Sequence, residues 1–285
     1  MAKGRKRILA NSVVTLATLL AYYATTLSPQ KHLWAGFWAL SVPLMLLTQI
    51  LFAAHWFLQK SWWIVLPLCT LVLGYPHFKS SINFSFKSPK NHTENTFSVF
   101  SYNVKVFNAY NHLQGKDSIN AKRLIQQVVE DSSDIKCLQE FFCEDSSKVF
   151  NTINRIKQEG KYKYIISPNL KKRHNYFGMA IFSKYPILKS GEIKFKKSYN
   201  RAHFADIKVK NKTVRVYNIH LQSISLDEDK MTNGNNYEEL KKNYNNIFRR
   251  MQRGFLKRTQ QVDLVIQHIK KSPYPVIVCG DFNDT

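Results

Sequence analysis

The sequence predicts an α/β sandwich, with helices outside two β-sheets, that follows an N-terminal membrane region. Residues 8–78 contain no acidic side chain and only two basic ones, Lys31 and Lys60, whereas charged residues recur from residue 79 onward. In that second part, strand-like and helix-like segments first alternate, and several strand-like segments then follow one another. This order is typical of a domain built from packed sheets with helices outside them.

Three apolar stretches divide the N-terminal region, at residues 8–27, 33–58 and 62–78. A helix needs about 20 apolar residues to cross a bilayer, so the first two stretches are long enough and the third is short. We expect a membrane region of residues 1–77 with three retained spans; the alternatives are two spans, or a first stretch cleaved as a signal peptide. The basic cluster at residues 3–7 predicts a cytoplasmic start, so that three crossings put the remaining chain on the non-cytoplasmic side of the cell membrane.

The polar, aperiodic stretch 78–96 reads as a linker, and residues 97–285 as one domain. Of the net charge of +23, +17 belongs to the chain after residue 77. Such a surface attracts phosphate-rich partners, either nucleic acid or anionic lipid headgroups. A general lysine-rich bias of the sequence explains the same charge equally well.

Short runs rich in β-branched and aromatic residues predict the strands. We expect them at residues 97–106, 135–138, 162–167, 178–183, 191–196, 202–209, 213–219 and 276–278. Helices are expected at residues 118–130, 146–158 and 246–270, from apolar positions that recur with the helical period. The polar stretch 225–245 is expected to be an exposed loop.

Polar motifs stand at the ends of four predicted strands, where a sheet-based enzyme presents its site. They are Ser101-Tyr102-Asn103-Val104, Leu138-Gln139-Glu140, Tyr217-Asn218-Ile219-His220-Leu221 and Gly280-Asp281-Phe282-Asn283-Asp284. Carboxylate and amide oxygens suit Mg²⁺ or Mn²⁺, and a carboxylate with a histidine suits phosphoryl chemistry. Taken singly, each motif is explained as well by a turn or by the polar end of a strand.

Together with Gly178–Ile187 (GMAIFSKYPI), these motifs occur in the order and spacing of a known family. From about Phe97 to Asp284, the chain resembles the endonuclease/exonuclease/phosphatase superfamily, whose fold is DNase I-like. The resemblance implies a four-layer α/β/β/α sandwich. The family pattern continues with further strands and a late Asp-His pair, whereas this sequence stops at Thr285. We therefore expect a C-terminally truncated form, incomplete in its second sheet and of uncertain activity by itself.

The resemblance also implies roles for six residues. They are Glu140 as principal metal ligand, Asn103 in the metal shell, His220 on the scissile phosphate, Asp281 on the attacking water, Asn283 on a phosphate oxygen, and Asn218 as a support of His220. The implied reaction is in-line attack of a metal-assisted water on phosphorus, with Mg²⁺ or Mn²⁺ as the ion.

The expected substrate is a phosphodiester, in nucleic acid or in a phospholipid headgroup such as that of sphingomyelin; no protein partner is predicted. The competing class is a membrane-anchored binding protein without activity. A site that had lost its activity should also have lost some of its residues, whereas this sequence keeps all five of Asn103, Glu140, His220, Asp281 and Asn283. A transporter is disfavoured because the apolar stretches carry no acidic residue, and their histidines lie near the predicted ends.

Overall fold

The computed structural model of the chain describes residues 2–81, 96–113, 119–172, 175–196, 198–224 and 237–283. The chain divides into two compact units. One contains residues 1–90 and 225–259, and the other contains residues 91–224 and 260–284. The two units are described separately.

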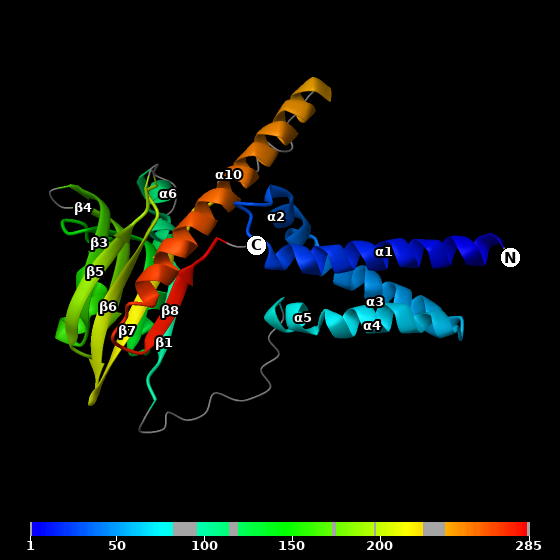
Figure 1. The fold of residues 1–285 in the computed structure, drawn as a ribbon. Coiled ribbons are helices and arrows are strands. Elements are labelled where there is room, and N and C mark those ends of the chain that lie inside the picture. The colour runs from blue at the N-terminus through cyan, green and yellow to red at the C-terminus, as the bar shows by residue number, and fades with distance from the viewer. Residues whose placement is uncertain are drawn as a thin grey trace. The chain divides into compact units, whose positions relative to one another are not determined.

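The helices at the N-terminus make up most of the first unit (Figure 1). They are α1 (Ala2–Thr26), α2 (Leu33–Leu40), α3 (Val42–Leu58), the 3₁₀ turn η1 (Trp62–Ile64), α4 (Val65–Leu73) and α5 (Tyr75–Ser81). Their apolar core is formed by Ala21, Tyr22, Val42 and Leu46. Within it, the buried Gln49 side chain donates from Nε2 to Thr18 Oγ1 at 2.9 Å, so the polar amide has a partner.

One described helix, Gly4–Thr26, is long and apolar enough to cross a membrane. The helices α2 and α3 make a second candidate only if they form one span bent by 45°. The third expected span corresponds to the short apolar helix Trp62–Leu73, so the expectation of three spans stays a prediction. The first residues of the expected linker, 78–81, are helical and belong to α5, and most of the rest lies outside the described residues.

The second unit contains two four-stranded sheets, which we call sheet A and sheet B. Sheet A has the order β1-β2-β4-β3, with β1 (Val99–Asn103), β2 (Ile135–Glu144), β3 (Lys163–Lys172) and β4 (Asn175–Ser183). Sheet B has the order β5-β6-β7-β8, with β5 (Ile187–Lys194), β6 (Arg201–Val209), β7 (Lys212–His220) and β8 (Val276–Asp281). The pairs β1–β2 and β7–β8 are parallel, and the other pairs are antiparallel.

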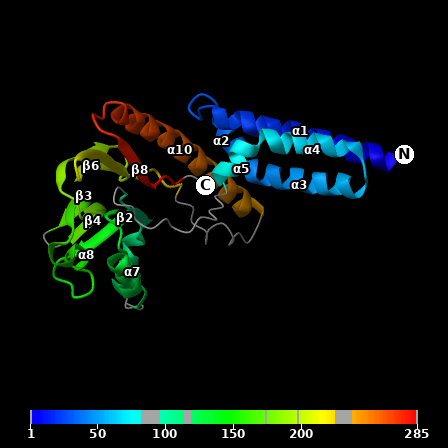
Figure 2. The same cartoon turned by 90° about the horizontal axis from the view of Figure 1, so that it is seen from below.

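The two sheets pack face to face and carry helices on their outer faces. Between them lies an apolar layer with Ile135, Cys137 and Ile181 from sheet A and Ala205, Ile207 and Val216 from sheet B. The helices α7 (Ile119–Glu130) and α8 (Thr152–Lys157) cover the outer face of sheet A and are both labelled in Figure 2. The last turns of α10 (Tyr237–Ile269) cover sheet B through Val262, Val265 and Ile269. The expected DNase I-like α/β/β/α sandwich is confirmed.

Two helices begin elsewhere than the sequence predicts. The helix α10 starts at Tyr237, inside the stretch expected to be a polar loop, because polar helical turns have no apolar periodicity to mark them. The helix α8 starts only at Thr152, after a turn at residues 145–146, so the expected helix from residue 146 is too long. The rest of the expected loop, residues 225–236, lies outside the described residues.

A buried amide joins the two sheets. Asn218 on β7 is fully buried, and its Nδ2 donates to the carbonyl oxygens of Leu138 at 3.1 Å and Ala180 at 3.0 Å, both on sheet A. Its Oδ1 accepts from Nε2 of Gln139 at 2.6 Å. Both amide hydrogens of Asn218 are therefore used between the sheets, on β2 and β4.

Replacing Asn218 by alanine would leave two carbonyl oxygens and the Gln139 amide without these partners inside the sandwich. An unsatisfied buried polar group costs about 1–3 kcal/mol, so we expect Asn218→Ala to lower the free energy of unfolding by about 3 kcal/mol. Urea denaturation, monitored by the near-ultraviolet circular dichroism of the tyrosines, measures this change. The exposed Gln127→Ala on α7 is the control and should change stability by less than about 0.5 kcal/mol. A loss at Asn218→Ala no larger than that of the control would contradict the joining role.

Candidate active site

Four strands bring polar side chains to one edge of the sandwich. Asn103 is the last residue of β1, which runs parallel to β2 and pairs with Gln139, the neighbour of Glu140. On sheet B, His220 and Asp281 end the parallel strands β7 and β8 and are register partners. The carboxyl ends of parallel strands meet at the same edge of a sheet, which is why motifs distant in the sequence converge here.

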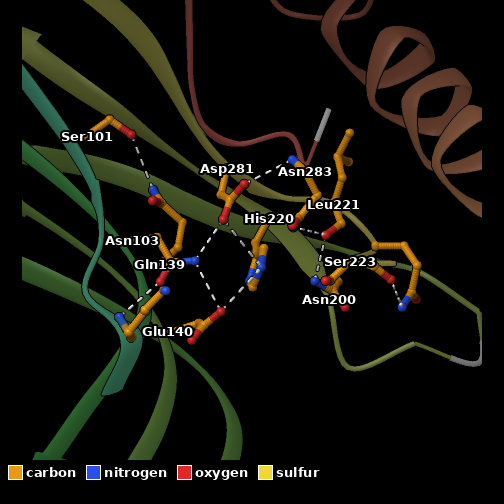
Figure 3. A network of polar contacts seen from close by, with 12 residues as sticks. Ser101, Asn103, Gln139, Glu140, Asn200, His220, Leu221, Ser223, Asp281 and Asn283 are labelled. Atoms are coloured by element: carbon orange, nitrogen blue, oxygen red, sulfur yellow. Dashed lines mark hydrogen bonds and ion pairs between the residues drawn. The ribbon is translucent and has the colours of Figure 1, made fainter. Parts of the chain in front are cut away.

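Asn103, Glu140, His220 and Asp281 form one cluster, which we call the polar tetrad (Figure 3). The Asn103 Nδ2 donates to Glu140 Oε1 at 3.1 Å and to Asp281 Oδ2 at 2.7 Å. His220 Nε2 lies 3.8 Å from the same glutamate oxygen and 3.9 Å from the same aspartate oxygen. Two carboxylates and an imidazole from both sheets are thus gathered around one amide group.

A β-bulge turns Glu140 into the tetrad. The β2–β4 register shifts between Leu138, opposite Ala180, and Phe141, opposite Gly178. Two residues of β2 therefore face one residue of β4, and Glu140 adopts a φ of 50°. A bulge with an extra residue re-aims side chains, and a positive φ is costly for a residue other than glycine. The result is that Gln139 points into the sheet interface while Glu140 remains partly exposed.

Gly280 lets β8 approach β7 closely just before Asp281. It has a φ of 140°, and a Cβ atom there would overlap the backbone of Ile219. Beyond it, Asp281 Oδ1 accepts from the backbone N–H of Asn283 at 2.9 Å, which is an Asx turn. The Gly-Asp-x-Asn motif therefore does form a turn. The turn also fixes the Asp281 carboxylate, whose other oxygen accepts from Asn103.

The Leu221 carbonyl connects three segments next to His220. It accepts from Asn283 Nδ2 at 2.8 Å and from Asn200 Nδ2 at 2.7 Å, and the Leu221 N–H donates to Asp281 O at 2.9 Å (Figure 3). Asn200 belongs to the connection between β5 and β6, and no sequence motif marked it. Its place beside the site follows from the sheet register, because the next residue, Arg201, is the register partner of His220.

Two predicted site residues make other contacts than expected. Asn283 lies beside Asp281, but its side-chain amide donates to Leu221 O rather than to the tetrad. Both N–H groups of the Asn218 side chain bond sheet A, so its contacts support the packing of the sheets beneath His220 rather than the imidazole itself. The roles given to both residues at a bound substrate stay predictions.

Burial decides the charge of the histidine. His220 has only 12% of its side chain exposed, and this burial lowers its pKa below the ordinary value, although Asp281 and Glu140 act in the opposite direction. The imidazole is therefore neutral near pH 7. A neutral imidazole keeps one N–H donor and one nitrogen acceptor, which suits it to hydrogen-bonding or proton transfer.

The residues of the polar tetrad suit a hard cation that keeps several water ligands better than a cation coordinated by protein side chains alone. In the described part of the chain, no group of three or more histidine, cysteine, aspartate or glutamate side chains could hold a metal ion. Glu140 Oε1 and Asp281 Oδ2 do lie around a common point, marked by the amide that donates to both. Mg²⁺ characteristically binds one or two carboxylates and keeps several waters, so these two oxygens would suffice. Asn103 Oδ1 accepts from Lys105 N at 3.0 Å, so its amide would have to turn to offer oxygen to an ion.

Solved structures and family models resemble parts of the chain. TDP2 of D. rerio, complexed with a single-strand DNA product, is 19% identical with a TM-score of 0.42, over 67% of this chain and 62% of that one. SmcL is 16% identical with a TM-score of 0.45, over 67% and 65%. ANGEL2, a 2′,3′-cyclic phosphatase, is 17% identical with a TM-score of 0.41, over 66% and 53%.

The chain thus spans less than two thirds of the length of each of these proteins. No curated protein matches it significantly. Residues 5–81 match a domain of unknown function (DUF8431). Residues 100–285, well over half of the chain and including the whole tetrad, match the model of the endonuclease/exonuclease/phosphatase family, and the chain belongs to that family.

Proposed function

We propose that this chain is a membrane-anchored hydrolase of phosphodiester bonds that depends on a divalent cation. Members of the family act on phosphoester bonds and generally use divalent metals. The observation that carries the proposal is the convergence of Asn103, Glu140, His220 and Asp281 within hydrogen-bonding and ion-pair distances at one edge of the sandwich.

The charge of the tetrad supports the need for a cation. Within the described residues, His220 is the only ion-pair partner of Glu140 and Asp281, and burial favours its neutral form. Two carboxylates without a lysine or arginine would repel an anionic phosphodiester. A divalent cation held by them reverses the local sign and stabilises charge that develops on the phosphoryl oxygens.

The side chains have complementary parts in the proposed reaction. The Asp281 carboxylate, aligned by N–H groups of Asn103 and Asn283, is placed to orient a water and accept its proton. His220 donates to a phosphate oxygen through its imidazole N–H. Glu140 would bind the cation, and the Asn103 amide, which hydrogen-bonds both carboxylates in the structure, would turn to offer its oxygen to the ion. Mg²⁺ or Mn²⁺ would suit this oxygen-rich set equally.

Removing the Glu140 carboxylate tests the site. We expect Glu140→Gln to reduce hydrolysis of bis(p-nitrophenyl) phosphate by about 100-fold or more, because it removes the charge that holds the cation. Chelation by EDTA should abolish wild-type hydrolysis, and Mg²⁺ or Mn²⁺ should restore it. Glu144→Gln, four residues along the same strand, is the matched control and should retain activity. Hydrolysis that persists in EDTA or in Glu140→Gln would refute the assignment.

The contacts of Asn200 predict a positioning role. Asn200→Ala removes one of two amide donors on Leu221 O, beside His220, and we expect kcat to fall about 10-fold with little change in KM. Steady-state kinetics measure both constants. The exposed turn residue Asn211→Ala is the control and should behave like the wild type. An unchanged kcat in Asn200→Ala would show that Asn283 alone suffices to hold the carbonyl.

The membrane anchor rests on the apolar N-terminal unit, with Gly4–Thr26 as the first span. Exposed apolar side chains cover this helix, among them Leu9, Val13, Leu16 and Leu20. If the N-terminal unit makes three crossings from a cytoplasmic N-terminus, the hydrolase domain lies on the non-cytoplasmic side. We expect the chain to stay in the membrane pellet after alkaline carbonate extraction; release into the supernatant would rule out an integral anchor.

A further inference from the structure

A second charged feature lies on the helical layer that covers sheet A. It is a hollow of about 500 Å³ between α7 and the segment that leads from β2 into α8. We call it the α7–α8 basic hollow. Its lining consists of Lys122, Arg123, Gln126, Lys148, Val149 and Arg155. None of these residues belongs to the polar tetrad, and none was singled out in the sequence.

The hollow contains four cations and no carboxylate. Lys122, Arg123 and Lys148 are exposed, and across the described ranges none of these three side chains has a hydrogen-bonding or ion-pair partner. Clustered like charges without counter-charges repel one another and create a positive potential that concentrates anions. The lining therefore favours an anionic ligand.

Arg155 is held in place within this hollow. Its Nη2 donates to Gln126 Oε1 at 3.3 Å, and its Nη1 donates to Val149 O at 3.4 Å. The Gln126 amide is itself fixed, since its Nε2 donates to Glu130 Oε1 at 2.7 Å. Glu130 accepts from this amide and, among the described residues, forms no ion pair with Arg155. A guanidinium fixed at two of its five N–H groups keeps donors for phosphate oxygens.

The topology puts the hollow beyond the edge at which the active site opens. The strand β2 passes Glu140, ends at Glu144 and leads into the loop that contains Lys148 and Val149. Lys148 therefore follows the carboxyl end of the strand that supplies the proposed cation ligand.

We propose that the α7–α8 basic hollow binds the phosphate backbone of a nucleic acid strand. Arginine, lysine and glutamine side chains are the groups that contact phosphates in protein–nucleic acid complexes. Basic clusters also attract anionic lipid headgroups. A surface that lies within the lipid interface, however, inserts tryptophan, phenylalanine or leucine between the headgroups, whereas the only apolar residue in this lining is the half-buried Val149. The inference rests on the proposed function, because it makes nucleic acid the class of substrate held by the domain.

Direct binding without turnover tests the hollow. The full chain in nanodiscs of neutral phosphatidylcholine, with EDTA present, is titrated against a short fluorescent single-stranded oligonucleotide. We expect the double variant Lys122→Glu/Arg123→Glu to bind about 10-fold more weakly or worse. The plot of log affinity against log salt should also become shallower by about 0.7 for each lost phosphate contact. The control carries the same charge change on sheet B, at the exposed Lys189 and Lys212.

Equal binding by the double variant and the control would overturn the proposal. So would wild-type binding of orthophosphate as tight as that of the oligonucleotide, which would make the hollow a small-anion site. Weaker association of the double variant with anionic vesicles, at unchanged oligonucleotide affinity, would assign it to a membrane surface instead. Failure of the proposed function is seen separately, since hydrolysis of bis(p-nitrophenyl) phosphate does not require the hollow and should be unchanged in the double variant.

Discussion

The inter-sheet hydrogen bonds of Asn218 and Gln139 are the constraint on which the candidate site depends. Gln139 precedes Glu140, and Asn218 lies two residues before His220, so the bond between their side chains joins the two halves of the tetrad. Both amides are buried, and an unpaired buried polar group costs about 1–3 kcal/mol. Apolar side chains would tolerate several alignments of the sheets. The amides favour the one alignment in which every donor has an acceptor, and this alignment brings Glu140 to His220.

Two unusual backbone positions complete this arrangement. Because of the bulge at Glu140, the Gln139 side chain lies in the interface between the sheets, and the next side chain, Glu140, lies at the open edge. Gly280 allows β8 to pass close to Ile219, so that Asp281 pairs with His220 in the register of the sheet. A regular strand would alternate its side chains between the two faces and could not supply both contacts. Glu140 therefore adopts an unfavourable φ at the point where the polar groups converge.

Much of this architecture could be predicted from the sequence. Runs rich in β-branched and aromatic residues predicted the eight strands of the described residues, although several strands begin or end elsewhere than expected. The four residues that meet in the tetrad were implied by the family resemblance of the motifs at the strand ends. Contacts that depend on tertiary packing could not be predicted, because an asparagine such as Asn200 or Asn218 has no local signal for its partner. The polar first turns of α10 could not be predicted, because the sequence of a helix without apolar periodicity resembles that of a loop. The basic hollow was equally hidden, since its cations come from segments more than twenty residues apart.

In the proposed function, the electrostatics of the domain would divide the binding of a phosphodiester between two places. The tetrad presents carboxylates and a histidine that burial keeps neutral, so the protein alone offers no net attraction to an anion there. The α7–α8 basic hollow presents four cations without carboxylates. A polyanion can then be attracted by the protein at the hollow and held by a bound cation at the tetrad. This separation has a chemical advantage: a lysine or arginine inside the tetrad would pair with Glu140 and Asp281 and compete with the divalent cation for the same oxygens.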